Sequence, residues 1–339
     1  MSMASEDAGP PSTQAAAQYA HEALRQFGLG GRARLTFLRE GENVTFRIDS
    51  ADERRFALRV HRKGYHDLDA IQSEHAWMSD LARAGVRVPT VVQTPGGDTV
   101  VQATLGSPEQ TRFCSMLEWI EGDLLHHLQC VDPLEAMPML GSAIAQLHLH
   151  ARSWTPPSRF VRTPWDSDAF VGDEPRWGDP AEATTWERST LDALRRARPA
   201  VRRCLQRLGT SPEVFSLIHA DLTAQNVLDC GGEIAIIDFD DCGPGWLLYD
   251  IAVALQDFEV DDRLERLQDA LLQGYVAVAG ELPVALELLP VFRIARRFAR
   301  LGWMGSRRGT EHQRLVSEPL IASTPASVER FLNWADRRA

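Results

Sequence analysis

Residues 219–238 constrain the fold and chemistry of this chain more than any other segment. Two short apolar runs flank Gly231-Gly232, and a glycine pair between such runs is typical of a tight β-hairpin. Asn226 precedes the first strand and Asp238 follows the second strand, so the hairpin would bring the two residues side by side. Because an amide oxygen and a carboxylate are suitable ligands for Mg²⁺, the sequence predicts that Asn226 and Asp238 are metal ligands.

The residues before Asn226 add a candidate proton acceptor. The run 219–226 reads His-Ala-Asp-Leu-Thr-Ala-Gln-Asn, with Asp221 on the loop that precedes the hairpin. A carboxylate there is placed to accept the proton of a hydroxyl that attacks a metal-bound phosphate. We therefore expect Asp221 to be the general base of a phosphoryl transfer. The alternative is an ordinary polar loop, with Asp238 as the turn residue at the end of a strand.

Together with the hairpin, the His-x-Asp-x-x-x-x-Asn run and Ile-Asp-Phe-Asp-Asp at 237–241 resemble the core of one known superfamily. It is that of aminoglycoside phosphotransferases and choline kinases, which are relatives of protein kinases. The resemblance spans residues 30–305 and implies a bilobal α+β fold, with a small β-rich N-terminal lobe and a large, mainly helical C-terminal lobe. It also implies ATP and Mg²⁺ as cofactors, and supporting roles for His219 and Asp250 around the catalytic loop.

The N-terminal third has the strand order of a nucleotide-binding lobe, with strands expected at 34–38, 44–48 and 55–60. Gly41 and Asn43 lie in the first turn, where the superfamily has a phosphate-covering loop, although an ordinary hairpin turn would read the same. The resemblance places Arg59 where kinases carry a phosphate-binding lysine. Glu74 lies on the apolar face of the next helix, where an unpaired charge is costly. We expect these two to pair, the alternative being that both face solvent.

The chain divides into three parts by sequence. Residues 1–14 read as a disordered tail, residues 15–118 as the nucleotide-binding lobe and residues 119–339 as the catalytic and substrate-binding lobe. An apolar strand at 116–122 joins the lobes. The resemblance implies that backbone groups around Glu118 and Ile120 bind the adenine.

Two regions are candidates for acceptor recognition. In the aperiodic segment 155–179, Trp165, Asp168 and Trp177 could hold an ammonium group by charge and cation–π contact. The alternative is that this segment packs as a cover on the large C-terminal lobe. The second region is a helix at 290–305 with an arginine face.

That arginine face has helical i, i+3, i+4, i+7 spacing. Its members are Arg293, Arg296, Arg297 and Arg300. We take Arg293 and Arg297 as candidates for acceptor contact. A solvated basic face, or pairing with the acids at 257–262, is the alternative.

Composition excludes several classes of function. The net charge of −11 disfavours nucleic acid as a partner, and no stretch reaches the roughly 20 apolar residues of a membrane span. Five widely spaced cysteines suggest neither a zinc site nor disulfides. We therefore expect a cytoplasmic protein with a small-molecule partner, of open oligomeric state.

The sequence as a whole predicts an ATP-dependent phosphotransferase that acts on a hydroxyl group. Asp-Phe-Asp-Asp-Cys-Gly at 238–243 and Leu-Arg-Val-His at 58–61 are most similar to the homoserine kinase-like and stress-response kinase branches. The expected acceptor is therefore an amino alcohol or a hydroxy amino acid. The alternatives are an aminoglycoside, a protein serine or threonine, or a catalytically dead nucleotide-binding module, which would usually lack the base or a metal ligand. The preference between ATP and GTP stays open.

Overall fold

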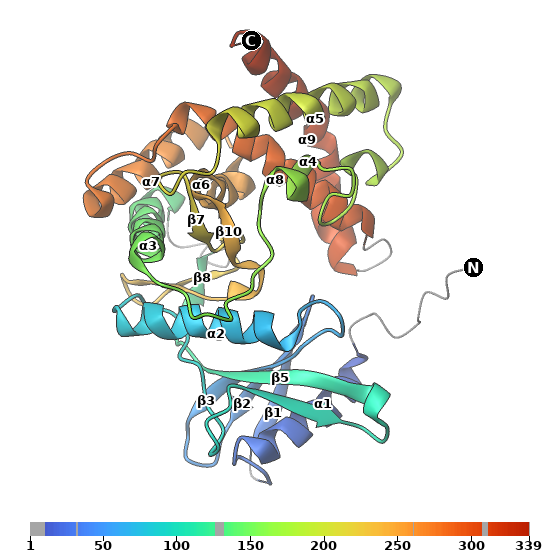
Figure 1. The fold of residues 1–339 in the computed structure, drawn as a ribbon, viewed down its shortest axis with the longest axis vertical. Helices are drawn as coiled ribbons and strands as arrows, with labels where there is room; N and C mark the ends of the chain where they lie inside the picture. The colour runs from blue at the N-terminus through green and yellow to red at the C-terminus, as the bar shows by residue number, and fades with distance from the viewer. Residues whose placement is uncertain (1–10, 32, 126–131, 260, 307–310, 339) are drawn as a thin grey trace. The chain divides into compact units, whose positions relative to one another are not determined.

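The computed structural model describes residues 11–31, 33–125, 132–259, 261–306 and 311–338 (Figure 1). The chain forms two compact units, each of which is built from separate stretches of sequence. The first contains Met1–Gly122, Thr155–Arg162 and Ala235–Asp240, and the second contains Asp123–Trp154, Thr163–Ile234 and Asp241–Ala339.

The first unit contains a five-stranded antiparallel sheet in the order β1-β2-β3-β5-β4 (Figure 1). Its strands are β1 (Arg34–Glu40), β2 (Val44–Asp49), β3 (Arg55–Val60), β4 (Val100–Thr104) and β5 (Thr111–Glu118). The three strands predicted at the start of the chain are present. The sequence did not predict β4, because five residues are too few for a clear pattern and pairing with β5 defines the strand.

Helix α1 (Thr13–Gln26) packs its apolar face on the sheet, where Tyr19 and Leu24 join the buried cluster. It begins at Thr13 because the Ser12 side chain accepts a hydrogen bond from the Ala15 backbone N–H at 3.3 Å. Helix α1 therefore starts inside the predicted tail of residues 1–14, and residues 1–10 lie outside the described part of the chain.

Helix α2 (Leu68–Arg83) follows β3, where the sequence predicted the next helix. The Asp67 carboxylate caps its start by accepting the Ala70 N–H at 2.8 Å. The helix buries an apolar face that also carries Glu74, which is fully inaccessible to solvent. This burial makes a partner for Glu74 an energetic requirement.

The second unit is mainly helical (Figure 1). Its helices are α3 (Pro133–Ser153), α4 (Ser167–Val171), α5 (Arg188–Leu208), α6 (Leu247–Leu255), α7 (Leu264–Ala279), α8 (Leu289–Ser306) and α9 (Glu311–Asp336). Helices α3 and α7 approach closely at glycines, since a Cβ on Gly141 would lie 1.9 Å from the Leu271 carbonyl oxygen.

Short strands frame the catalytic loop in this unit. Strand β7 (Phe215–Ile218) pairs with β10 (Gly243–Trp246), and β6 (Asp123–Leu124) pairs with β8 (Val227–Asp229), both antiparallel. Strand β9 (Ile234–Ile236) follows the predicted glycine turn, and its residues from Ala235 onward belong to the first unit.

The small antiparallel sheet and the helical second unit confirm the predicted kinase-like α+β class. Among the described helices, none has the length and hydropathy needed to cross a membrane.

Candidate active site

The catalytic loop at 219–226 is held by the buried carboxylate of Asp250 on α6. Its Oδ1 accepts the Ala220 backbone N–H at 2.7 Å, and its Oδ2 accepts the His219 N–H at 3.0 Å. These bonds stabilise Ala220 at φ +68°, a left-handed conformation that costs a residue with a Cβ about 1–2 kcal/mol. Such strain is typical of functional loops. Asp250 therefore holds the backbone of this loop, and its supporting role in catalysis stays a prediction.

Both oxygens of the Asp221 carboxylate are held by donors. Arg296 Nη2 donates to Oδ1 at 2.6 Å, and Asn226 Nδ2 donates to Oδ2 at 2.7 Å. About a quarter of the Asp221 side chain is solvent-exposed. The carboxylate is therefore fixed in orientation and still accessible to a small molecule.

Arg296 is itself fixed from two sides. Its Nε donates to Gln256 Oε1 at 2.7 Å, and its guanidinium lies 5.9 Å from the centre of the Trp177 ring. Burial opposes its charge, but Tyr249 and Asp221 together raise the pKa of Arg296 above its ordinary value, so the group stays cationic. Burial raises the pKa of Tyr249 to about 12, which keeps the phenol neutral.

Sequence reasoning placed Arg296 on the arginine face but chose Arg293 and Arg297 as the residues that contact the acceptor. The structure instead uses Arg297 to join helices, since its Nη1 donates to the Leu320 carbonyl at 3.2 Å and its Nη2 pairs with Glu259. Arg293 Nε lies 3.7 Å from the same glutamate. Both arginines therefore pair with an acid of the 257–262 segment, which was the alternative to acceptor contact. Helical spacing identifies a face, but it cannot tell which member reaches the loop.

The three residues of the 155–179 segment have different environments. Trp165 is fully buried, donates from Nε1 to the Asp241 carbonyl at 2.7 Å and has the Arg176 guanidinium 4.2 Å from its ring centre. This is the packed-cover alternative, so Trp165 is unsuited to binding an ammonium. The Asp168 side chain is largely exposed, 3.7 Å from Arg202.

Trp177 lies beside Arg296 and is half-buried. Its Nε1 is inaccessible and has no hydrogen-bond partner in the described part of the chain. An unsatisfied buried donor is costly, and an acceptor atom of a bound molecule would satisfy it. Of the three residues, Trp177 therefore remains a candidate for acceptor contact.

In the first unit, the predicted pair of Arg59 and Glu74 is present. Arg59 Nη1 donates to Glu74 Oε1 at 2.7 Å, and both side chains are buried. The same guanidinium reaches Asp238, with Nη2 3.0 Å from Oδ1. Burial disfavours its charge, but Asp238 and Glu74 raise the pKa of Arg59 above its ordinary value. One arginine thus joins β3, α2 and the 235–240 segment.

Asp238 lies at φ +67°, again a left-handed conformation on a residue with a Cβ. The following residue, Phe239, packs edge-on against Trp77 of α2 at 5.4 Å between ring centres. Arg39 of β1 also forms an ion pair with the Asp238 carboxylate. Sequence reasoning missed Arg39, because nothing in a strand sequence shows which distant carboxylate its side chain meets.

Asn226 fits the role of a magnesium ligand. Its Nδ2 donates to Asp221, both to the backbone oxygen at 2.9 Å and to the carboxylate, so its Oδ1 points away from that residue. This oxygen is buried and has no hydrogen-bond partner among the described residues. An oxygen left without a donor suits a hard cation.

The chain matches the phosphotransferase enzyme family, APH, over residues 34–288. It belongs to this family. An aminopropanol kinase associated with a microcompartment is 34% identical, with a TM-score of 0.83 over 93% of this chain and 97% of that one. An amicoumacin kinase, solved with AMP-PNP and Ca²⁺, is 20% identical, with a TM-score of 0.73 over 93% and 96%. An uncharacterized protein of Deinococcus radiodurans is 30% identical over 82% of this chain and 79% of its own.

The first turn of this phosphotransferase is braced by Asn43. The Gly41 N–H donates to the Asn43 carbonyl at 3.0 Å, and the Asn43 Oδ1 accepts the Arg62 N–H at 3.3 Å. The Asn43 side chain therefore stabilises the turn, and the backbone around Gly41 is left as the phosphate-facing candidate.

The expected adenine-binding strand of this phosphotransferase ends earlier than predicted. Strand β5 ends at Glu118, although the next residue, Trp119, still donates its backbone N–H to the Arg55 carbonyl of β3 at 3.1 Å. The Glu118 N–H donates to the Thr90 carbonyl at 2.8 Å, and its carboxylate pairs with Arg54. Because that N–H already donates within the chain, it is not available to a bound base.

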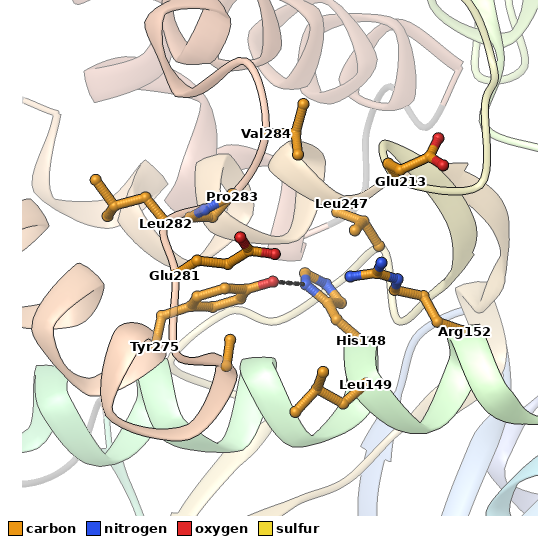
Figure 2. Close-up of a pocket in the computed structure, with 11 residues that line it drawn as sticks. His148, Leu149, Arg152, Glu213, Leu247, Tyr275, Glu281, Leu282, Pro283 and Val284 are labelled. Atoms are coloured by element: carbon orange, nitrogen blue, oxygen red, sulfur yellow. Dashed lines mark hydrogen bonds between the residues drawn. The ribbon is translucent and has the colours of Figure 1, made fainter.

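A pocket in the second unit is lined by residues of α3, α6 and α7 (Figure 2). His148 on α3 forms part of its wall, with Nδ1 3.2 Å from the Tyr275 hydroxyl and Nε2 3.3 Å from Asp250 Oδ2. His148 thus contacts the carboxylate that holds the catalytic loop. Its contacts are those of a structural residue.

Proposed function

We propose that this protein is an ATP-dependent kinase that transfers the γ-phosphate to the hydroxyl of a small amino alcohol. The observation that carries the proposal is the Asp221 carboxylate, oriented by Arg296 and Asn226 on a strained loop and still open to solvent. A hydroxyl that donates to this carboxylate would lose its proton to it as the oxygen bonds to the γ-phosphorus, while the bond from that phosphorus to the bridging oxygen breaks and ADP leaves. The other candidate residues bind and orient.

The nucleotide is assigned to the first unit. Arg59 would bind its phosphates in place of the usual lysine, while Glu74 holds the guanidinium in position. Asn226 and Asp238 would hold Mg²⁺, which neutralises phosphate charge when bound. The backbone at Gly41 and near Ile120 would contact the phosphates and the adenine.

Similarity to an aminopropanol kinase at 34% identity supports an amino alcohol as the acceptor. A hydroxy amino acid is the second candidate, because the cationic Arg296 beside Asp221 would attract a carboxylate. Trp177, with its unsatisfied indole N–H, is the proposed acceptor contact.

The test is ATP consumption with 1-amino-2-propanol, ethanolamine, homoserine and an aminoglycoside offered separately, with the Asp221→Asn variant as the inactive reference. We expect turnover with an amino alcohol that depends on Asp221. Turnover with homoserine alone would favour the second candidate. A protein that binds ATP but phosphorylates none of these acceptors would be a nucleotide-binding module, and the proposed reaction would be wrong.

A further inference from the structure

A β-bulge in β1 determines where the Arg39 side chain points. In the pairing of β1 with β2, Phe37 lies opposite Phe46 and Arg39 lies opposite Thr45, so Leu38 is an extra residue. Regular pairing would place Arg39 opposite Val44, whose side chain is in the apolar core. Because side chains alternate between faces, one extra residue moves Arg39 to the other face of the sheet.

On that face, Arg39 belongs to a row with Arg59. Thr45 lies opposite Arg39 on one side and opposite Arg59 on the other, so the two arginines share one line across three strands. Both guanidinium groups meet the same carboxylate, with Arg39 at Oδ2 and Arg59 at Oδ1 of Asp238. The bulge thus supplies Asp238 with a second cation.

The two arginines differ in how firmly they are held. The Arg59 side chain is 7% exposed and also binds the buried Glu74, whereas the Arg39 side chain is 50% exposed. Asp238 is the one partner of Arg39 recorded among the described residues. Arg39 can therefore leave the carboxylate at low cost, and Arg59 cannot.

Charge balance indicates what displaces Arg39. The four groups Arg39, Arg59, Glu74 and Asp238 carry two positive and two negative charges. A divalent cation on Asp238 would compete with the guanidinium for the same oxygens and would add positive charge. A nucleotide that arrives with the cation brings phosphate oxygens, and a guanidinium pairs well with phosphate.

We infer that Arg39 is a phosphate-binding residue of the nucleotide site. Without nucleotide it rests on Asp238. When a metal–nucleotide complex occupies that carboxylate, the Arg39 guanidinium exchanges it for a phosphate oxygen. This inference rests on the proposed function, because it requires nucleotide and metal at Asp238.

The experiment is a calorimetric titration of adenosine, ADP and ATP, with and without Mg²⁺, into wild type, Arg39→Ala and Arg39→Lys. Arg47→Ala is the matched control, because Arg47 lies on the same sheet and pairs with Asp49 at 3.1 Å, so the variant loses the same charge nearby. A hydrogen bond between charged groups contributes enough free energy that we expect Arg39→Ala to weaken MgATP binding about tenfold. Adenosine binding should not change, and lysine should restore part of the loss.

Each other result overturns the inference in a distinct way. MgATP affinity in Arg39→Ala within twofold of wild type would mean that Arg39 does not contact phosphate. Tighter MgATP binding by Arg39→Ala would mean that Arg39 only competes with the metal for Asp238. An equal loss in Arg47→Ala would indicate general electrostatics. If wild type binds neither ATP nor ADP, the proposed function is wrong as well. In the first three results wild type still binds nucleotide, so only the inference about Arg39 is wrong.

Discussion

Replacing Arg296 with methionine tests whether the orientation of Asp221 controls turnover. Methionine keeps much of the side-chain volume on α8 but removes the guanidinium that donates to Asp221 Oδ1 at 2.6 Å. Asn226 remains as the single donor to the carboxylate side chain among the bonds described above. Asp221 then keeps its place on the loop but loses one of its described hydrogen-bond donors.

The size of the effect follows from the exposure of the two groups. Opposite charges about 4 Å apart attract by about 4 kcal/mol at an effective dielectric constant of about 20. Because the Asp221 side chain is 26% exposed, water replaces part of that attraction when Arg296 is removed. We therefore expect the free energy of unfolding to fall by about 1–2 kcal/mol, less than the cost of breaking a fully buried pair. A base displaced by about 1 Å costs about 10²-fold in rate, so we expect kcat to fall by about 10–100-fold.

The assay compares kcat and both KM values of Arg296→Met with those of Arg297→Met. Arg297 is the matched control, because it is the next residue, is equally buried and pairs with Glu259 instead of Asp221. We expect both variants to lose stability, measured by urea unfolding, but only Arg296→Met to lose kcat per folded molecule. The KM for ATP should stay the same in both.

Two results would refute this reasoning. If Arg296→Met keeps kcat within threefold of wild type, the contact with Asp221 has no part in turnover. If Arg297→Met loses kcat to the same extent, the loss reflects disturbance of α8 and carries no information about the base.

Three further predictions concern the remaining candidate residues. Asp221→Asn should lower kcat by about 10²–10⁴-fold, the usual contribution of a general base, while the ATP affinity measured by calorimetry should not change. A kcat within threefold of wild type would show that Asp221 is not the base. Arg59→Ala and Glu74→Ala should each raise the KM for ATP, and the double variant should lose less than the sum; strict additivity would contradict coupling. Asp250→Ala removes the acceptor of two loop N–H groups and should lower the free energy of unfolding, measured by urea titration, by about 2–4 kcal/mol. A decrease below about 1 kcal/mol would contradict the described hydrogen bonds.

The elements that the sequence predicted correctly are those encoded by local pattern. Strand β3 and helix α2 have clear periodicity and clear ends, such as the Asp67 cap. The pair of Arg59 and Glu74 was predictable because a buried acid requires a partner and the chain offers a nearby cation. Each of these inferences needs only a short stretch of sequence and a rule of burial.

The errors about site residues concern side chains whose environment depends on distant segments. Trp165 reads as a possible ammonium ligand, but its ring is covered by Arg176 and its indole N–H is bonded to Asp241. Arg297 shares a helical face with Arg296 and nevertheless contacts α9. Which partner each side chain meets depends on tertiary packing that a sequence pattern does not contain.

The replacement of lysine by arginine at position 59 joins these observations. A lysine ammonium is a compact charge, whereas a guanidinium presents separate nitrogens in a planar fork. Arg59 uses Nη1 for Glu74 and Nη2 for Asp238, so it connects α2 to the proposed metal ligand without any nucleotide. That connection leaves Arg39 as the exposed, exchangeable cation at the same carboxylate. If phosphate binds as proposed, an arginine at position 59 would shift part of that binding to Arg39, which the bulge in β1 directs to Asp238.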